Sequence, residues 1–225
     1  MIENISPYAF VIFSATVILS AFLFIKATGY NKISIILIVS WTVIQSGLGF
    51  LGFYSSDGAL TSRFPLLVVL PILFLSSLFF TNRGRAFING LNIKTLTLFH
   101  VIRIPVEVTL LLLFIDGAVP QAMTFEGRNF DILSGLSAPI IYYLAFMKRS
   151  VGTKILVTWN IICMLLLLSV VTTAVLSLPE RFMFHGFEQP NIAVGYFPFL
   201  LLPALLVPLA LFSGAAAIRK LLIQQ

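Results

Sequence analysis

The sequence predicts an all-α integral membrane protein with seven transmembrane helices, and three observations support that prediction. The chain is far more apolar than a soluble domain: 59% of its 225 residues are hydrophobic and only 10% are charged, whereas soluble domains carry about 25% charged residues. The apolar residues form runs close to the length of about 20 residues that a spanning helix requires. The connections between these runs alternate between basic and mainly acidic, as expected when they lie on alternate sides of a membrane.

Seven apolar segments can be placed along the chain. The predicted helices are 7–27, 33–54, 64–80, 95–115, 130–147, 155–176 and 192–218. Because an acidic residue and no basic residue precede the first segment, it does not resemble a cleaved secretory signal, and we expect it to be retained as a span. The third segment is the shortest and contains Pro65 and Pro71. The connections are short, so we expect one polytopic transmembrane domain over residues 1–225.

Basic residues gather in every second connection, which predicts the orientation. Cytoplasmic connections collect Lys and Arg, so we expect the N-terminus outside and the C-terminus in the cytoplasm. The basic residues expected on the cytoplasmic side are Lys26, Lys32, Arg83, Arg85, Lys94, Lys148, Arg149, Lys154, Arg219 and Lys220. The charged residues expected outside are Arg63, Arg128 and Arg181 with Glu3, Asp57, Asp116, Glu126, Asp131, Glu180 and Glu188. This topology accounts for the net charge of +6 without a nucleic-acid partner. The expected location is the bacterial cytoplasmic (inner) membrane.

The fourth segment contains the stretch FHVIRIPVEV, which brings His100, Arg103 and Glu107 into the membrane. At 1.5 Å per residue from Thr95, these residues lie about 8, 12 and 18 Å deep, and the last is just past the midplane. Their spacing of three and four residues puts them on one face of the helix. We call these three residues the ladder.

Two interpretations of the ladder are open. Ionisable groups at membrane depth are costly and face partners or a wet cavity. Arg103 and Glu107, four residues apart, can neutralise each other, and the ladder then only braces the fourth helix within the bundle. Alternatively, the ladder lines a polar cavity in which His100 and Glu107 exchange protons or substrate. Pro105 favours the second interpretation because it removes a backbone donor and frees a carbonyl beside the charges.

Other polar residues could extend this site. Gln45 in the second segment and Asn160 in the sixth are candidates for a polar interior, although single amides more often bridge helices. On the outside, Glu126, Arg128 and Asp131 lie at the entrance to the fifth segment and are candidates for a substrate vestibule. The alternative is that Asn129 or Asp131 caps that helix and complements its positive end.

Similar sequences recur in the two halves of the chain. LIVSWTVI in the second segment matches ILVTWNII in the sixth, FPLLVVLP in the third matches FPFLLLP in the seventh, and FVIFSA in the first matches FDILSG in the fifth. The order and direction of these pairs predict two parallel three-helix halves joined by a fourth helix, a repeat that transporters use. This layout resembles the topology of the SWEET and PQ-loop transporters. The resemblance implies no residue roles here, because the PQ of VPQA falls in an external loop.

Several classes of membrane protein are excluded by missing residues. The last segment contains no lysine to bind retinal, and His100 is the only imidazole within the membrane, whereas bis-histidine haem needs two. Catalytic zinc needs about three protein ligands, and His100 with Glu107 supplies at most two. Cys163 is the only cysteine, which rules out an internal disulfide. No nucleotide or nucleophile motif is present, so we expect no metal and no cofactor.

Three functions are compatible with the sequence. The favoured one is a transporter-like protein that moves a small solute or protons past the fourth helix, with Glu107 and His100 carrying protons and Arg103 attracting an anion. The second is a membrane-embedded enzyme acting on a lipid or isoprenoid, with Glu107 or His100 as acid or base. The third is a non-catalytic accessory subunit. Membrane lipids are the expected partners, a further copy of the chain remains open, and the sequence does not decide whether the protein is an enzyme.

Overall fold

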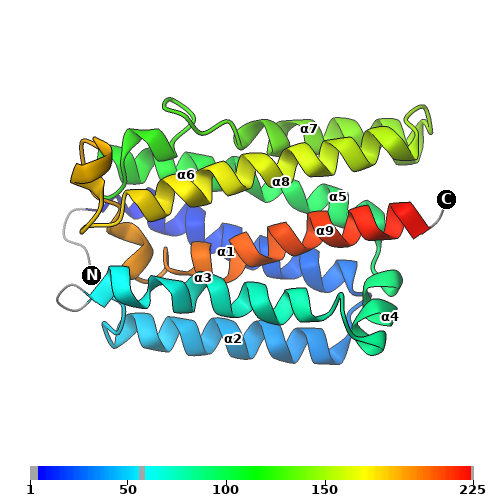
Figure 1. The fold of residues 1–225 in the computed structure, drawn as a ribbon, viewed down its shortest axis with the longest axis horizontal. Helices are drawn as coiled ribbons and strands as arrows, with labels where there is room; N and C mark the ends of the chain where they lie inside the picture. The colour runs from blue at the N-terminus through cyan, green and yellow to red at the C-terminus, as the bar shows by residue number, and fades with distance from the viewer. Residues whose placement is uncertain (1–4, 56–58, 224–225) are drawn as a thin grey trace.

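The computed structural model describes residues 5–55 and 59–223, and within these ranges the protein is helical with no strand. This confirms the predicted all-α fold class. Glu3 and Asp57, two of the acidic residues used to predict the orientation, lie outside the described residues. The long helices run along the longest axis of the molecule (Figure 1), so that α1 begins at one end and α9 finishes at the other.

Helices account for all predicted segments, with shifted ends. The long helices are α1 (Pro7–Ala27), α2 (Lys32–Phe50), α3 (Ala59–Ser77), α6 (Arg103–Ile115), α8 (Thr153–Leu176) and α9 (Val207–Ile223). The shorter ones are α4 (Asn82–Gly90), α5 (Ile93–Phe99) and α7 (Ile132–Tyr142). A 3₁₀ turn, His100–Ile102, joins α5 to α6; the π-helical segment Tyr143–Met147 extends α7; and another, Leu202–Leu206, leads into α9. Single 3₁₀ turns occur at Gln121–Met123, Phe182–His185 and Ala193–Gly195.

Six helical stretches in the described residues are long and apolar enough to cross a membrane. They are Pro7–Ala27, Lys32–Phe50, Leu60–Ser77, Ile93–Ile115, Thr153–Leu176 and Leu202–Ile223. The predicted segment 130–147 is also an apolar helix, Ile132–Met147, but it is shorter. Large apolar side chains such as Ile18, Ile36, Val43, Leu73 and Leu165 are exposed on these helices, a surface that water would not tolerate but lipid does. The chain is a multi-pass membrane protein.

Side-chain caps set several helix starts. Ser6 accepts a hydrogen bond from the Tyr8 amide at the start of α1. Pro7, at the first helical position, has no backbone N–H that would require a partner. Asn31 and Asn92 each accept from two amides in the first turns of α2 and α5, and Thr81 accepts from Gly84 at the start of α4. Helix α4 lies where the sequence predicts only a short connection between the third and fourth segments.

The last spanning stretch, Leu202–Ile223, begins about ten residues later than predicted. Residues 192–201 contain Pro198, and Pro203 follows, so the chain lacks two backbone donors there. The amides of Ile192 and Ala193 instead donate to the Ala118 carbonyl, at 3.0 and 3.2 Å, and the Asn191 amide donates to Ser177. These bonds tie the segment to the loops after α6 and α8, which leaves Leu202–Ile223 as the spanning stretch.

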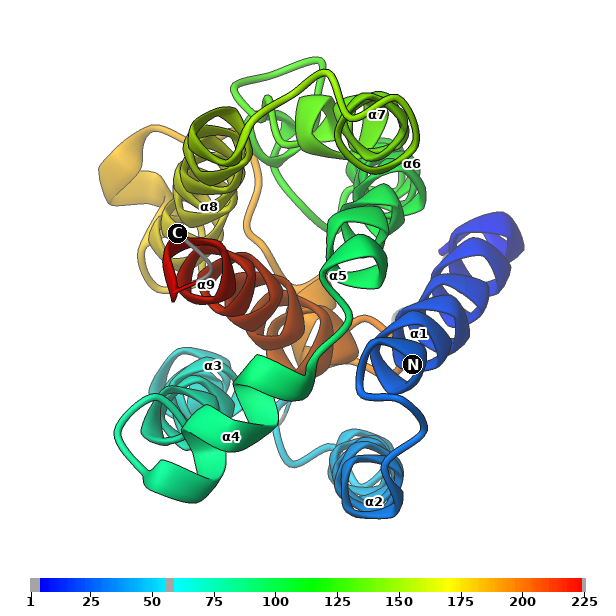
Figure 2. The same ribbon diagram turned by 90° about the vertical axis from the view of Figure 1, so that its right-hand side faces the viewer.

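The core is centred on α9. Figure 2 shows α9 in the middle of the bundle, with α8, α3, α5 and α1 around it and α4 lying across one end, which we call the α4 end. Of the apolar stretch that includes α9, 61% is buried, against 22% in α2 and in α3. Phe13, Phe24, Phe99 and Phe212 lie in this core, with the Phe24 ring 5.9 Å from that of Phe212. Of the six candidate spans in the described residues, those of α2 and α3 are thus the least buried.

Candidate functional site

The three ladder residues are buried where α5 bends into α6. The exposed fractions of His100, Arg103 and Glu107 are 0%, 3% and 1%. The bend follows from Pro105, which cannot donate to the carbonyl four residues earlier. The Val101 carbonyl instead accepts from the Arg103 amide in the 3₁₀ turn. The turn ends α5 at Phe99 and restarts the helix at Arg103.

Arg103 pairs with Asp131 and not with Glu107. Its Nη1 donates to Asp131 Oδ1, the ion pair found among the described residues, and to the Cys163 carbonyl at 2.9 Å. Arg103 Nε and Nη2 are buried without a hydrogen-bond partner in the described protein. The expected ion pair between Arg103 and Glu107 is therefore replaced by one that links α6 to the start of α7. The spacing of residues along one helix could not reveal this partner, because Asp131 comes from a neighbouring helix.

Glu107 is held by an amide. Asn129 Nδ2 donates to Glu107 Oε1 and, at 2.9 Å, to the Met123 carbonyl. The Asn129 Oδ1 accepts from the Asp131 backbone amide at 2.9 Å, so Asn129 links the Glu107 carboxylate to the backbone of Asp131. The second oxygen, Glu107 Oε2, is buried and has no hydrogen-bond partner in the described residues. We call Arg103, Glu107, Asn129 and Asp131 the buried cluster.

Asp131 stands at the N-cap position of α7, but its side chain does not cap the helix. Besides Arg103, the carboxylate accepts a hydrogen bond of 3.3 Å from the Ser134 hydroxyl. Asp131 is 3% exposed and Asn129 equally so. The start of α7 has no side-chain cap, so the expected capping role of Asn129 or Asp131 is not found. Asp131 belongs instead to the cluster.

His100 lies beside α8. Its ring meets Trp159 edge to face, with centroids 5.0 Å apart, and the Asn160 side chain is near enough to interact with it. The Asn160 amide group donates to Leu156 at 2.8 Å. Both His100 ring nitrogens and Asn160 Oδ1 are buried without a hydrogen bond to another described group. Of the predicted interior residues, the structure thus brings Asn160 to the ladder.

The remaining predicted site residues lie apart from the ladder. Gln45 is buried and accepts a hydrogen bond of 2.8 Å from the Tyr54 hydroxyl at the opposite end of the bundle from α4. Burial raises the pKa of Tyr54, which lies beyond the end of α2. Glu126 and Arg128 are exposed in the loop before α7. The expected vestibule of three residues is therefore divided between this loop and the buried Asp131.

A small cavity reaches the two carboxylates. It has a volume of about 40 Å³ and is lined by Glu107 and Asp131 together with apolar side chains from α3, α6, α8 and the Leu202–Val207 stretch. A cavity needs about 10–15 Å³ to hold one water molecule. The space beside Glu107 is thus large enough for water and too small for a sugar or a nucleotide.

No protein-family model, no curated protein and no solved structure matches the chain. Among the described residues, no group of three His, Cys, Asp or Glu side chains is placed to hold a metal ion.

Sequence reasoning missed how Asn129 and Cys163 contribute. Asn129 was expected only as a helix cap, and the Cys163 backbone carbonyl was not considered. The sequence contained a signal for Asn129, because Asn129 and Asp131 both come directly before an apolar helix. A polar side chain that does not cap such a helix can reach a neighbouring helix. Nothing in the sequence points to the Cys163 carbonyl, because any residue at that position would provide one.

Proposed function

We propose that this multi-pass membrane protein is transporter-like and moves protons, alone or with a small solute, with Glu107 as the exchangeable proton site. The observation that carries the proposal is the charge balance of the buried cluster: it contains one guanidinium, on Arg103, and two carboxylates, on Glu107 and Asp131. Arginine stays charged in proteins, and an unpaired buried charge costs roughly several kcal/mol. The cluster is electrically neutral when one of its two carboxylates is protonated.

Glu107 is better suited than Asp131 to hold that proton. Asp131 is paired directly with Arg103, whereas Glu107 is bonded to a neutral amide and has one oxygen free beside the cavity. A water molecule in the cavity would give Glu107 a partner for proton exchange. Intramembrane carboxyl groups with these properties are typical of proton pathways.

A route toward the α4 end is supported by His100 and Asn160. Both residues lie on the α4 side of Arg103. The His100 ring nitrogens and Asn160 Oδ1 have no hydrogen-bond partner among the described residues. Toward the opposite end, Asn129 and Asp131 connect Glu107 to the loop before α7. These groups form a discontinuous series of polar atoms through an otherwise apolar bundle, and small movements or water molecules would have to connect them.

The proposal includes the finer topology that the sequence predicts. Seven crossings require Ile132–Met147 to span, which it can do if the membrane is locally thinned or flanking residues reach the interface. Basic residues in α4, around the start of α8 and near the end of α9 favour the α4 end as the cytoplasmic one. The parallel repeat and a bacterial inner-membrane location belong to the same proposal. A lipid-modifying enzyme has less support, since the cavity at Glu107 is too small for a lipid headgroup.

Proton flux through purified protein in liposomes tests the function. With a potassium gradient and valinomycin as the driving force, a trapped pH dye should report flux through the wild type. Glu107→Gln should lower this flux by about a hundredfold, the low end of the cost of losing a proton-transfer group. The Gln side chain can still accept from Asn129, so the variant should fold.

The matched control is Glu126→Gln, which removes an exposed carboxyl group from the neighbouring loop. It should leave the flux unchanged. Equal fluxes through wild type, Glu107→Gln and empty liposomes would reject proton movement. The accessory-subunit interpretation would then be favoured, with the cluster serving as a brace.

A further inference from the structure

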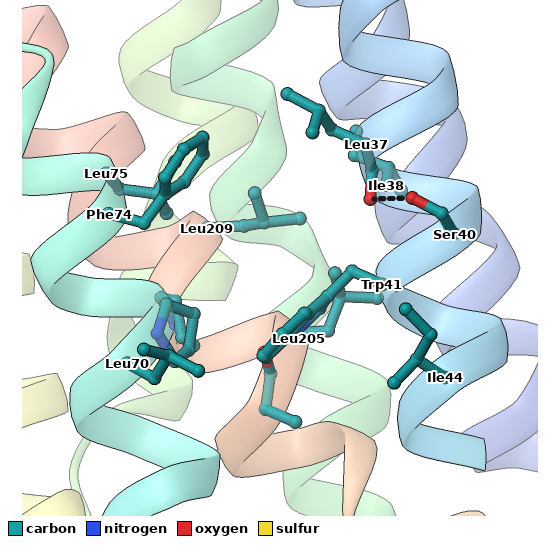
Figure 3. A pocket seen from close by; sticks show the side chains of 13 residues that line it. Leu37, Ile38, Ser40, Trp41, Ile44, Leu70, Phe74, Leu75, Leu205 and Leu209 are labelled. Atoms are coloured by element: carbon teal, nitrogen blue, oxygen red, sulfur yellow. Dashed lines mark hydrogen bonds between the residues drawn. The ribbon is translucent and has the colours of Figure 1, made fainter. Parts of the chain in front are cut away.

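An open apolar groove separates α2 from α3. Two adjoining cavities, of about 350 and 390 Å³, share the residues Leu37, Ile38, Phe74, Leu75 and Leu209 and so form one continuous groove. In Figure 3, Leu37 and Ile44 of α2 face Leu70 and Phe74 of α3, and Leu205 and Leu209 lie between them. The volume is within the range of about 300–1,000 Å³ that is typical of small-ligand sites.

The middle of the groove offers no polar group to a ligand. Trp41 Nε1 donates to the Ala204 carbonyl at 2.8 Å, which lacks its usual helical donor because residue 208 is proline. The Ser40 hydroxyl donates to the Ile36 carbonyl at 2.6 Å. Since the polar side chains in the middle of the groove are satisfied by the protein, this part fits a hydrocarbon chain and not a polar solute.

The groove ends at positive charge. Its lining at the α4 end includes Arg83, Asn31 and Thr81. Arg83 is exposed and makes no hydrogen bond or ion pair to the described residues. Lys32 follows Asn31 at the start of α2, and no acidic residue of the described chain lies at this end. An arginine at a membrane surface with no acidic neighbour favours a phosphate group.

The groove is distinct from the buried cluster. The Leu202–Leu206 segment lies between them: Leu202 and Pro203 line the cavity at Glu107, whereas Ala204 and Leu205 line the groove. A ligand in the groove would not contact Glu107 or Asp131. An inference about the groove therefore does not depend on the function proposed for the cluster.

We infer that the groove between α2 and α3 binds one anionic phospholipid, with an acyl chain along Phe74 and Leu37 and its phosphate at Arg83. The apolar walls select a chain, and the charge at the α4 end selects a negative headgroup. Of the six candidate spans found among the described residues, those of α2 and α3 have the smallest buried share. The lipid therefore acts as packing that the protein itself does not provide.

Native mass spectrometry tests this inference. Purified protein in mild detergent is mixed with equal amounts of phosphatidylglycerol and phosphatidylcholine that carry the same chains. The wild type should retain the anionic lipid about fivefold better, the effect of one basic residue near a lipid phosphate. Arg83→Gln should abolish the preference. Lys94→Gln, which removes the same charge at the same end but outside the groove lining, should keep it.

The chain-binding part has its own matched pair. Leu37→Trp fills the groove and should reduce retention of both lipids, whereas Val39→Trp adds the same ring to an exposed position of α2 outside the lining and should not. Glycerol 3-phosphate, which has the charge without the chains, should not compete. Circular dichroism checks that each variant is folded.

Three results would overturn the inference: equal retention of the two lipids by the wild type, equal effects of Arg83→Gln and Lys94→Gln, or equal effects of the two tryptophan variants. Competition by glycerol 3-phosphate would assign Arg83 to a soluble phosphate instead. Glu107→Gln should retain the lipid preference, so failure of the proton-flux proposal and failure of the lipid site can be told apart.

Discussion

At the scale of single residues, the buried cluster is governed by a mismatch between one cation and two carboxylates. Asp131 pairs directly with Arg103, and Glu107 is the second carboxylate within the same buried region. If either carboxyl group is replaced by an amide, the other can still neutralise the guanidinium. If both are replaced, Arg103 is left buried without a counter-ion, and it cannot lose its own charge.

This predicts that Asp131→Asn and Glu107→Gln are coupled. Each single variant should cost less than the roughly 3–5 kcal/mol expected when a buried ion pair is broken with no substitute. The double variant should lose about 1–3 kcal/mol more free energy of unfolding than the two single losses added together. Unfolding of the purified variants in detergent, followed by circular dichroism, measures the coupling.

Asp131→Asn combined with Glu126→Gln is the control for that measurement. Glu126 is exposed, so its removal should add to the effect of Asp131→Asn without coupling. Additivity in the Glu107 pair as well would show that Glu107 does not act as a reserve partner for Arg103.

At the scale of helices, the cluster depends on how closely α7 approaches α6. A Cβ at Gly135 would lie 2.8 Å from Ile104 Cγ1 and 3.1 Å from the Ile104 amide nitrogen. A small residue at this crossing lets the two backbones come together. Asp131 is one turn earlier on the same helix, so the crossing at Gly135 also sets the distance over which Asp131 meets Arg103.

Gly135→Leu should therefore separate α7 from α6 and weaken the ion pair. Inserting a large side chain into a packed interface costs about 1–3 kcal/mol, which a lower thermal midpoint in detergent would show. Gly47→Leu on α2 is the matched control, since a Cβ there meets nothing within 4 Å and leucine favours helix over glycine by about 1 kcal/mol. Equal losses in the two variants would contradict the importance of this crossing.

At the scale of the whole molecule, the open question in the topology is whether α7 and its extension, Ile132–Met147, cross the membrane. Glu126 and Ser150 are exposed on either side of this helix. If it crosses, the two positions lie on opposite sides, and positive charge near Lys148 and Arg149 predicts that Ser150 is cytoplasmic.

Labelling of introduced cysteines decides between the topologies. In intact cells, a membrane-impermeant maleimide should label Glu126→Cys but not Ser150→Cys, and permeabilisation should expose the second. The wild type is its own background control, because Cys163 is buried and should not react. Labelling of both positions from the same side would show that the helix does not span and that the chain crosses six times.

The sequence alone determined the membrane class, the all-α fold and the positions of most helices. These follow from local properties, namely the length of apolar runs and the charges between them. The sequence also identified His100, Arg103 and Glu107 as ionisable residues within an apolar helix, because such residues are visible wherever they interrupt an apolar run.

Only the tertiary structure decided which groups these residues meet. Arg103 and Glu107 are near each other in sequence, yet Arg103 pairs with Asp131 from α7 and the Cys163 carbonyl of α8. The late start of α9 and the groove beside Trp41 likewise depend on contacts between distant segments. Hydrophobic periodicity describes one helix at a time, whereas the partner of a buried charge is set by how several helices pack.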